Sequence, residues 1–319
     1  MKVLLAGASG TLGRFLVPQL IAAGHDVTGV TRRARAADRL TRAGATAVVA
    51  DVLDRDALLT AVDGLAADAV VHELTALTKA PARYGDMEPT NRLRVEGTRN
   101  LLDAAGRLGA TRFLTQSMFL GYGFRDLGRA PLSEEAPFAV PTGARTDPVL
   151  AALKSTEDQV RGAAPGIDGI ALRYGLFYGG DVDVYAALLR KRRLPVPSGH
   201  SGTLALIHHE DAASATVAAL ERGVAGRAYN IVDDTPATWR ELMEEVARTT
   251  RTPRPLALPA GLIRLAAPYI GEVMTHVDVR VSNGRARTEL GWTPRYPGYR
   301  EGLAAGATTD TLQAPEGPG

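Results

Sequence analysis

The chain has 319 residues, with 37 Lys and Arg against 35 Asp and Glu, so its formal charge at pH 7 is +2. This near balance gives no general electrostatic reason to expect nucleic acid as a partner. The sequence contains no cysteine, which excludes disulfides, thiolate metal sites and a thiol nucleophile. We find neither a signal-peptide pattern after Met1 nor an apolar run long enough to span a membrane, and therefore predict a soluble, cytoplasmic protein without a membrane partner.

Short aliphatic runs alternate with amphipathic stretches through the first 175 residues. This pattern predicts a parallel sheet covered by helices, an α/β fold of the Rossmann-type, doubly wound class. In the fourth predicted helix, Leu93, Gly97, Leu101 and Ala104 share one stripe and arginines lie opposite. Strands are expected at 2–6, 26–30, 45–50, 69–72, 112–115 and 169–173, and helices at 11–23, 35–43, 54–62, 90–108 and 147–161.

The alternation breaks after residue 175, where Pro and Gly become frequent. Helices expected at 182–192, 211–222, 236–250, 259–275 and 284–290 outnumber strands at 204–207 and 227–231. This region predicts a smaller C-terminal lobe. Residues 302–319 are rich in Ala, Gly, Thr and Pro without an apolar period, so much of this end is expected to be a mobile tail.

A glycine-rich turn joins the first strand to the first helix. Its sequence is Gly7-Ala-Ser-Gly10-Thr-Leu-Gly13, a Gly-x-x-Gly-x-x-Gly spacing. Glycines there permit a tight turn and let the backbone approach a pyrophosphate, which the N–H groups of the helix receive. We therefore predict a dinucleotide site; a glycine-rich loop without a ligand is the alternative.

The residues that end the second strand indicate which dinucleotide binds. NAD-preferring proteins place Asp or Glu there, whereas this chain has Thr31 followed by Arg32 and Arg33. A guanidinium suits a 2′-phosphate, so we predict NADP(H) in preference to NAD(H); solvated surface arginines are the alternative. After the third strand, Asp51 is placed to accept from adenine, and Asp54 is expected to cap the next helix.

Several further segments match one family in their order and spacing. Together with the glycine-rich turn, they are residues 50–52, 70–72, 91, 96–105, 117, 172–175, 177–179, 207–213, 228–232 and 286–292. On these residues the chain resembles an extended or atypical short-chain dehydrogenase/reductase, of the kind named NAD-dependent epimerase/dehydratase. The resemblance covers the chain to about residue 303.

The resemblance implies roles for the cofactor-binding residues and a division of the chain. Asp51 and Val52 would contact the adenine, and Leu74 and Thr75 the ribose side of the nicotinamide. The cofactor domain would comprise 1–174 and 205–232, the substrate-binding lobe 175–204 and 233–303, and the tail 304–319. The turn residues assigned to the pyrophosphate are Gly7, Ser9, Gly10, Thr11, Leu12 and Gly13.

Three aromatic residues, Tyr174, Phe177 and Tyr178, lie at the end of the sixth predicted strand or just past it. Ligands of open parallel sheets collect at this carboxyl edge. We predict that Tyr174 contacts the cofactor and that Phe177 and Tyr178 contact the substrate. Core packing is the alternative.

The catalytic helix of the family has no clear equivalent here. Typical members carry a Tyr-x-x-x-Lys in which the Tyr transfers the proton and the Lys lowers its pKa and holds the ribose. Lys154 is the candidate lysine, and Leu150 then occupies the tyrosine position. Alignment on Glu157 places Val149 there instead. Neither aliphatic residue can transfer a proton, so the family tyrosine is missing in both registers.

The catalytic Ser or Thr that typical members carry at the end of the fifth strand is also ambiguous. Ser117 is the candidate, although alignment on Tyr122 and Gly123 places Met118 at this position. Ser117 and Tyr122 are candidates for both catalysis and substrate contact. Lys154 is a candidate for both catalysis and cofactor binding.

These departures leave three functions open. The first is an NADP(H)-dependent reductase of a small carbonyl, imine or activated alkene, with a proton supplied by Lys154, Tyr122, water or the substrate. The second is a non-redox elimination, cyclisation or isomerisation, and the third is NADP(H) binding without catalysis. Analogy with the family also suggests a homodimer formed through helices near 90–108 and 147–161.

Other polar residues are weaker candidates. Glu73 is a possible pocket acid, beside His72, which matches a family histidine that is commonly structural. The run 208–211, His-His-Glu-Asp, resembles a metal cluster. Neighbouring residues on a strand point to opposite faces, however, and the family match makes Asp211 a helix cap. We therefore expect no metal.

Overall fold

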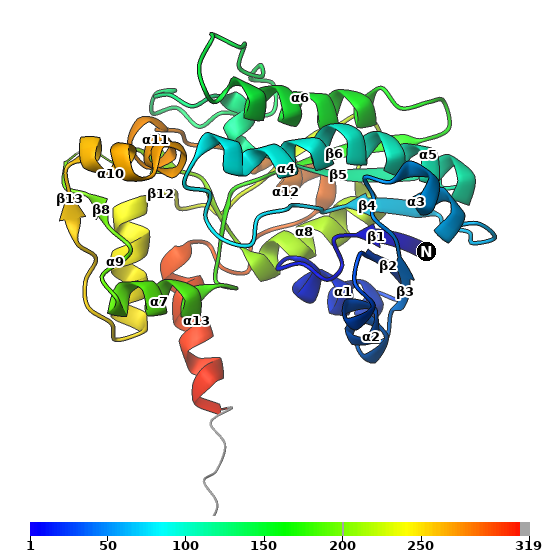
Figure 1. The fold of residues 1–319 in the computed structure, drawn as a ribbon, viewed down its shortest axis with the longest axis horizontal. Coiled ribbons are helices and arrows are strands. Elements are labelled where there is room, and N and C mark those ends of the chain that lie inside the picture. Colours follow the sequence, from blue (N-terminus) through cyan, green and yellow to red (C-terminus); the bar gives the residue numbers. More distant parts are fainter. Residues whose placement is uncertain (200, 313–319) are drawn as a thin grey trace, which may run out of the picture.

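The centre of the molecule is a seven-stranded sheet in the order β11-β6-β5-β4-β1-β2-β3 (Figure 1). The structure is a computed structural model that describes residues 1–199 and 201–312. All neighbouring strands of this sheet run parallel, which confirms the predicted Rossmann-type doubly wound fold. The strands are β1 (Lys2–Ala6), β2 (Asp26–Thr31), β3 (Thr46–Val49), β4 (Ala69–His72), β5 (Arg112–Met118), β6 (Asp168–Tyr174) and β11 (Ala228–Ile231).

Helices cover both faces of the sheet, because its central strands carry apolar side chains on both sides. One face packs against α1 (Gly13–Ala22), α2 (Ala34–Arg42), α8 (His209–Arg222) and α12 (Gly284–Leu290). The other packs against α3 (Arg55–Ala61), α5 (Thr98–Leu108) and α6 (Asp147–Arg161). Leu16 of α1 and Leu101 of α5 have no exposed surface, and each belongs to the apolar core on its own side.

The strand order reverses between β1 and β4. From β1 the chain proceeds to β2 and β3 on one side, and from β4 to β5, β6 and β11 on the other. The carboxyl ends of β1 and β4 therefore mark the point at which open α/β sheets bind ligands, the expected crevice of this fold. The glycine-rich turn follows β1 directly, and Glu73 follows β4, with its N–H donating to the Ala6 carbonyl at 2.8 Å.

The helix predicted at 90–108 is longer and is interrupted by a wider turn. It begins as α4 (Glu88–Arg92), continues through the π-helical turn η2 (Leu93–Gly97) and ends as α5. The 3₁₀ turn η1 (Tyr84–Met87) precedes it. A single π-turn within an α-helix rotates the residues around it relative to the rest of the helix, and such turns are frequent at functional sites.

The C-terminal lobe gathers several helices on the side of the molecule away from β1, β2 and β3 (Figure 1). Its apolar core includes Trp239, Leu242 and Met243. The helix predicted at 259–275 is broken at Ala267, because Pro268 has no N–H to continue it. The lobe helices are α7 (Val182–Arg190), α9 (Trp239–Thr249), α10 (Ala260–Ala266), α11 (Pro268–His276) and α13 (Tyr299–Leu312).

Three short strand pairs lie outside the main sheet. The strand predicted at 204–207 is two strands, and the second of them joins β7 instead of the central sheet. The chain returns to the cofactor domain through α8, which packs on α1, and through β11. The pairs are β7 (Leu176–Tyr178) with β10 (Leu206–His208), β9 (Thr203–Leu204) with β12 (Ala237–Thr238), and β8 (Val196–Pro197) with β13 (Ala257–Leu258).

Part of the region expected to form a tail is helical in the structure, as far as Leu312. Residues 299–312 form α13, which packs against α9. Tyr299 and Leu303 are each 2% exposed, so the helix has an apolar anchor at its start that the small residues after it concealed in the sequence. The rest of the predicted tail, residues 313–319, lies outside the described residues.

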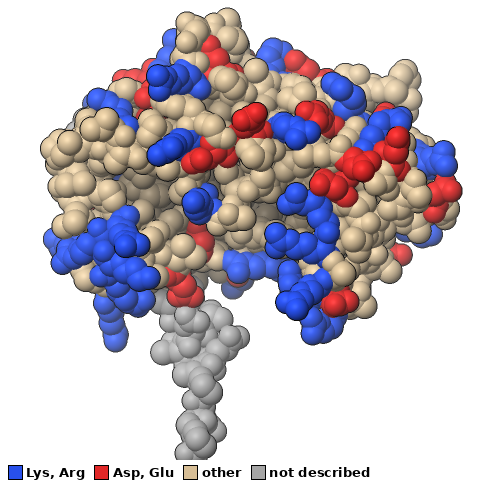
Figure 2. Space-filling view, in the orientation of Figure 1, with Lys and Arg blue, Asp and Glu red and all other residues tan. Residues whose placement is uncertain are grey.

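Charged side chains of both signs are interspersed over most of the face in Figure 2. Basic side chains gather over the region of α7 and α9. The helix predicted at 182–192 ends at Arg190, where the basic run 190–193 begins. Within residues 1–199 and 201–312, no helix has the length and apolar character needed to cross a membrane.

A buried ion pair joins α6 to β6. Glu157 and Arg173 are 2% and 4% exposed, and two hydrogen bonds of 2.9 and 2.8 Å link the guanidinium to the two carboxylate oxygens. Such bidentate pairs have strict geometry. The pair therefore fixes how α6 is rotated against the sheet.

Replacing one partner of this pair should destabilise the fold strongly. Arg173→Met leaves the Glu157 carboxylate buried without its partner, which typically costs about 3–5 kcal/mol. Urea unfolding should show this loss. In the control Lys154→Met, which removes an exposed pair on the same helix, stability should change by less than about 1 kcal/mol. A similarly small change in Arg173→Met would contradict the assigned role.

Candidate active site

Two glycines of the turn 7–13 are required by its geometry. Gly7 has φ +102°, and a Cβ there would lie 2.6 Å from the Glu73 carbonyl oxygen. At Gly13 a Cβ would lie 2.3 Å from the Ala8 carbonyl oxygen. The first glycine lets the chain turn beside β4, and the second lets α1 start against the loop.

The exposed part of this turn suits a pyrophosphate. Ser9, Gly10 and Thr11 are exposed, whereas Leu12 packs into the core below them. No side chain caps the start of α1, and no acidic residue lies in its first turn. The N–H groups at a helix start need acceptors, and an anionic phosphate provides them. The residues present therefore fit the diphosphate of a dinucleotide.

The residues predicted at the adenosine end meet at the carboxyl ends of β2 and β3. Arg32 is exposed, with Nη1 3.9 Å from Asp51 Oδ2, and Arg33 occupies the N-cap position of α2. Asp51 accepts the Leu53 N–H at 3.0 Å, and Val52 is buried. These side chains surround one corner of the crevice, where an adenosine phosphate would lie.

Asp54 caps α3 as predicted. Its Oδ1 accepts the Ala57 N–H at 3.0 Å, which satisfies one of the free donors of the helix start.

On the nicotinamide side, the chain after β4 is held by neighbouring elements. The Leu74 carbonyl accepts from Gln116 of β5, and Thr75 lies with its hydroxyl 3.4 Å from that of Thr90. Thr75 is exposed at the rim of the crevice. His72 is fully buried, and its ring contacts the Leu93 carbonyl and the Leu74 N–H at 3.2 Å each. His72 therefore orders this segment from beneath.

Glu73 and Tyr174 form a buried pair under the glycine-rich turn. The Tyr174 hydroxyl donates to Glu73 at 2.9 Å and lies 2.6 Å from the Thr216 hydroxyl. Tyr174 has no exposed surface, so in this structure it packs in the core instead of facing the crevice. Burial raises the pKa of Glu73 to about 8, although the hydrogen bond from Tyr174 acts to lower it.

Ser117 and Met118 differ in their access to the crevice. Ser117 has no exposed surface, and its hydroxyl has no hydrogen-bond partner among the described residues. Met118 is partly exposed and packs with the lobe. This placement favours the alignment on Tyr122 and Gly123, which assigns Met118 to the serine position.

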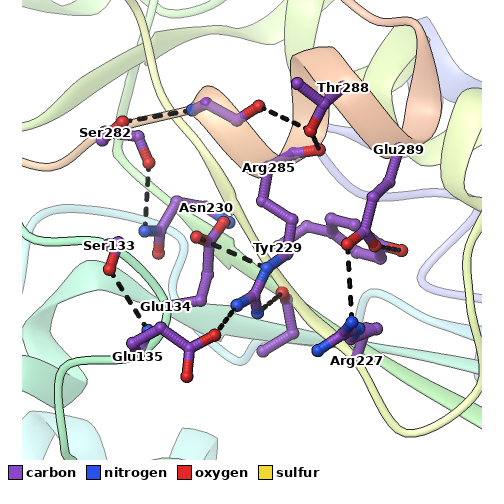
Figure 3. Close-up of polar contacts among 12 residues, drawn as sticks. Ser133, Glu134, Glu135, Arg227, Tyr229, Asn230, Ser282, Arg285, Thr288 and Glu289 are labelled. Atoms are coloured by element: carbon purple, nitrogen blue, oxygen red, sulfur yellow. Dashed lines mark hydrogen bonds and ion pairs between the residues drawn. The ribbon is translucent and has the colours of Figure 1, made fainter.

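Tyr122 belongs to a polar network that closes one side of the site. Its hydroxyl donates to Asn230 Oδ1 at 2.8 Å and accepts from Arg173 at 3.0 Å. The Asn230 N–H in turn donates to Glu134 at 2.7 Å, and Arg285 pairs with both Glu134 and its neighbour (Figure 3). Because its hydroxyl both donates and accepts a hydrogen bond within this network, Tyr122 anchors the β5–α6 connection in this structure.

The rotation of α6 separates Lys154 from the inner face. Val149, Leu153 and Glu157 are all buried, at 3%, 0% and 1% exposure. Lys154 is 54% exposed and pairs with Asp158 at 2.6 Å. The buried face of α6 thus includes Val149, Leu153 and Glu157, and Leu150 of the other register is buried as well, at 5% exposure. Lys154 therefore lies on the exposed side of α6.

Phe177 and Tyr178 have packing roles in this structure. The Phe177 ring lies between Tyr174 and His209, with centroids 5.3 and 5.1 Å away. The Tyr178 hydroxyl donates to Asp233 at 2.7 Å. Phe177 is partly exposed at the edge of this stack, whereas Tyr178 is 1% exposed.

The run 208–211 is divided among separate partners. His208 caps α8 by accepting the Glu210 N–H, and His209 Nδ1 lies 2.7 Å from the Tyr178 carbonyl. Asp211 is not the cap that was predicted: it accepts the N–H groups of Arg295 and Tyr296. Among the residues that the structure describes, no group of three or more His, Cys, Asp and Glu side chains is arranged to hold a metal ion.

One residue beside the crevice was missed. Arg94 of the π-turn is 2% exposed, although the helical pattern placed the arginines of this segment on the outer face. A π-turn leaves no signal in hydrophobic periodicity, so the sequence could not have shown this side chain turning inward.

Comparison with known proteins identifies the family. The model for "NAD dependent epimerase/dehydratase family" matches residues 3–232. The chain is 38% identical to a Streptomyces 3-diazoavenalumate denitrifying reductase over 95% of this chain and 99% of the relative. It is 29% identical to the 2-alkyl-3-oxoalkanoate reductase of Stenotrophomonas maltophilia over 80% of this chain and 77% of that relative.

Solved structures share the fold. UDP-glucose 4-epimerase of Thermotoga maritima aligns with a TM-score of 0.78 at 20% identity, covering 98% of this chain and all of that one. A dTDP-glucose 4,6-dehydratase from Bacillus anthracis in complex with NAD aligns with a TM-score of 0.77 at 15% identity, covering 98% and 97%.

The chain therefore belongs to the NAD-dependent epimerase/dehydratase family. Its similarity to reductases supports an oxidoreductase activity, and the family supports a nicotinamide cofactor.

The buried Glu73 should make stability fall as the pH rises. Its pKa in the folded protein, about 8, lies above that of an unfolded Glu, so the folded state holds the proton more tightly. This contribution is complete below about pH 4 and is lost toward pH 8, at a slope of at most about 1.4 kcal/mol per unit.

Urea unfolding of wild type and Glu73→Gln between pH 5 and pH 8 measures the effect. Relative to the variant, wild type should lose stability across this range. The control Asp158→Asn, at an exposed acid, should run parallel to wild type. Parallel curves for Glu73→Gln as well would refute the assignment.

Proposed function

We propose that the protein is an NADP(H)-dependent reductase whose substrate accepts a hydride without a proton from the protein. The proposal rests on one observation: Val149 and Leu153 lie on the inner face of α6, at the positions where the family carries its Tyr and Lys in the Glu157 register. Neither side chain can donate, accept or orient a proton. A carbonyl or imine substrate would leave an anion to protonate, and this face offers nothing for that task.

A diazonium substrate needs no proton from the protein. Reduced nicotinamide supplies a hydride, which brings two electrons to the substrate carbon. The new C–H bond replaces the C–N bond, whose electron pair leaves with N₂. The positive charge of the diazonium ion cancels the charge of the hydride, so the reaction balances with no proton. The 38% identity to a denitrifying reductase for 3-diazoavenalumate supports this substrate class.

An aliphatic inner wall also suits this chemistry. A diazonium ion is attacked by water and by basic side chains, so apolar neighbours would protect it until hydride transfer. In this proposal Met118, Val149 and Leu153 form that wall. Ser117, Tyr122 and Lys154 then act outside the chemical step, in packing, in the polar network and on the surface.

The choice of NADP(H) follows from Arg32 and Arg33. Both are exposed at the end of β2, and no Asp or Glu occupies the end of that strand. A guanidinium can donate two hydrogen bonds to a 2′-phosphate, whereas the hydroxyl of NADH offers no charge to pair with.

Replacing both arginines should change cofactor preference. Arg32→Ala/Arg33→Ala should weaken NADPH binding by about tenfold or more, the usual effect of losing a charged hydrogen bond, and leave NADH binding within about threefold. Fluorescence titration of the reduced cofactor measures both. The matched control Arg35→Ala removes another exposed arginine just inside α2 and should change neither. Superimposable NADPH titrations for wild type and the double variant would disprove the preference.

Isotope transfer tests the reaction itself. With [4-²H]NADPH and 3-diazoavenalumate, deuterium from one face of the nicotinamide should appear at the carbon that carried nitrogen, with one N₂ released per NADPH oxidised. In D₂O with unlabelled NADPH, that carbon should carry hydrogen only.

Two variants control this experiment. Gly10→Asp puts a carboxylate where the pyrophosphate would bind, at a position where a Cβ meets only the Gly7 carbonyl oxygen at 3.1 Å, and should abolish transfer. Lys154→Ala should retain it. Deuterium uptake from D₂O, or NADPH binding without turnover, would exclude direct hydride substitution.

A further inference from the structure

Arg94 carries a buried charge that nothing in the described structure neutralises. The side chain is 2% exposed, and its Nε and Nη1 atoms have no hydrogen-bond partner among residues 1–199 and 201–312. No carboxylate forms an ion pair with it in the described part of the chain. Other buried or half-buried cations are compensated: Arg173 pairs with Glu157, and Arg285 with Glu134 and Glu135. An uncompensated buried charge destabilises a fold, so its presence needs a reason.

The position of Arg94 connects it to the candidate active site. It lies in the π-turn η2, whose first residue contacts His72 at the carboxyl end of β4. Burial, with a smaller effect of the Arg94 charge, lowers the pKa of His72 to about 4. The guanidinium therefore lies near the edge of the sheet where a nicotinamide and its substrate would meet.

The charge of Arg94 also acts on Tyr269, which belongs to an aromatic cluster of the lobe. Burial raises the pKa of Tyr269 to about 12, and the Arg94 charge acts in the opposite direction. The Tyr269 ring packs edge-on against the rings of Tyr84 and Phe124, with centroids 5.9 and 6.1 Å away. Tyr84 and Phe124 are only partly buried, so this cluster presents apolar ring surface beside a cation.

These three rings come from three separate segments. Tyr84 precedes α4, Phe124 follows β5, and Tyr269 begins α11. The Tyr269 N–H donates to the Ala82 carbonyl at 2.9 Å, which joins the lobe to the loop after β4. The cluster therefore lies where the cofactor domain meets the lobe, a preferred place for ligand sites.

We propose that Arg94 binds the carboxylate of an aromatic substrate. The rings of Tyr84, Phe124 and Tyr269 would hold its aromatic part. An aryl carboxylate carries an anion that can pair with the guanidinium, and a ring that can pack on the aromatic surface. The inference deepens the proposed function and rests on it, because it specifies the diazonium substrate as an aromatic acid.

Binding of unreactive probes tests the assignment. The protein with NADPH is titrated by calorimetry with 3-phenylpropanoate and with 3-phenylpropanamide, which has the same ring without the charge. Wild type should bind the acid at least about tenfold more tightly than the amide. In Arg94→Met this preference should fall to within about twofold. Phe124→Leu should weaken binding of both probes alike.

A neighbouring arginine provides the matched control. Arg92 lies two residues away in the same helix but is exposed and paired with Glu96. Arg92→Met should keep the tenfold preference. Without a ligand, Arg94→Met should melt at the same temperature as wild type or higher, because an unpaired buried charge has been removed.

Several outcomes would overturn the proposal. They are failure of the acid to bind, equal binding of acid and amide by wild type, an unchanged preference in Arg94→Met, or a lower melting temperature of that variant with the preference retained. Neither probe carries a diazo group, so binding is independent of hydride transfer. Absent deuterium transfer with selective binding of the acid would therefore count against the proposed reaction alone.

Discussion

The buried pair between Glu157 and Arg173 determines the character of the candidate active site. Two hydrogen bonds lock α6 to β6 in one rotation, and the inner face of α6 follows from it. One and two turns before Glu157 along that face lie Leu153 and Val149. The same guanidinium also donates to Tyr122, which anchors the connection between β5 and α6. One interaction thus holds the elements on both sides of the candidate site, and in the proposed reaction α6 would supply the aliphatic side.

An aliphatic wall is consistent with hydride transfer, because the cofactor and the substrate can carry that chemistry between them. The protein then has to bind both molecules, orient them and exclude water. The uncapped start of α1 and the glycines at 7 and 13 serve the first task for the cofactor. For the substrate, Arg94 and the rings beside it would do the same. On this view specificity comes from charge and shape around the reacting carbon instead of from an acid or base.

Much of the fold could be predicted because it depends on local pattern. β1, β4, α6 and α12 have the predicted bounds, and the glycine-rich turn lies where its spacing placed it. The prediction failed where a tertiary contact decides the outcome. Tyr299 and Leu303 give α13 an anchor that its Ala- and Gly-rich sequence does not suggest.

The site was harder to predict than the fold. The sequence left two registers of α6 open, and it gave no sign of the pair with Arg173 that decides which face of the helix packs on β6. Arg94 was invisible because a π-turn changes which residues face inward without changing the hydrophobic pattern. Tyr174 and Tyr178 matched their expected places along the chain, yet their hydroxyls bond to buried acids. Position along a strand predicts which elements a side chain lies near, but it does not predict which partner its polar group finds.

The lobe is not a continuous piece of chain. Its core includes Leu189 and Val196 from before α8, and Trp239 and Met243 from after β11, while α8 and β11 pack with the cofactor domain. The polypeptide therefore enters the lobe, leaves it and enters it again. No single cut could release the lobe as an intact unit, and no single exchange of sequence could transplant it.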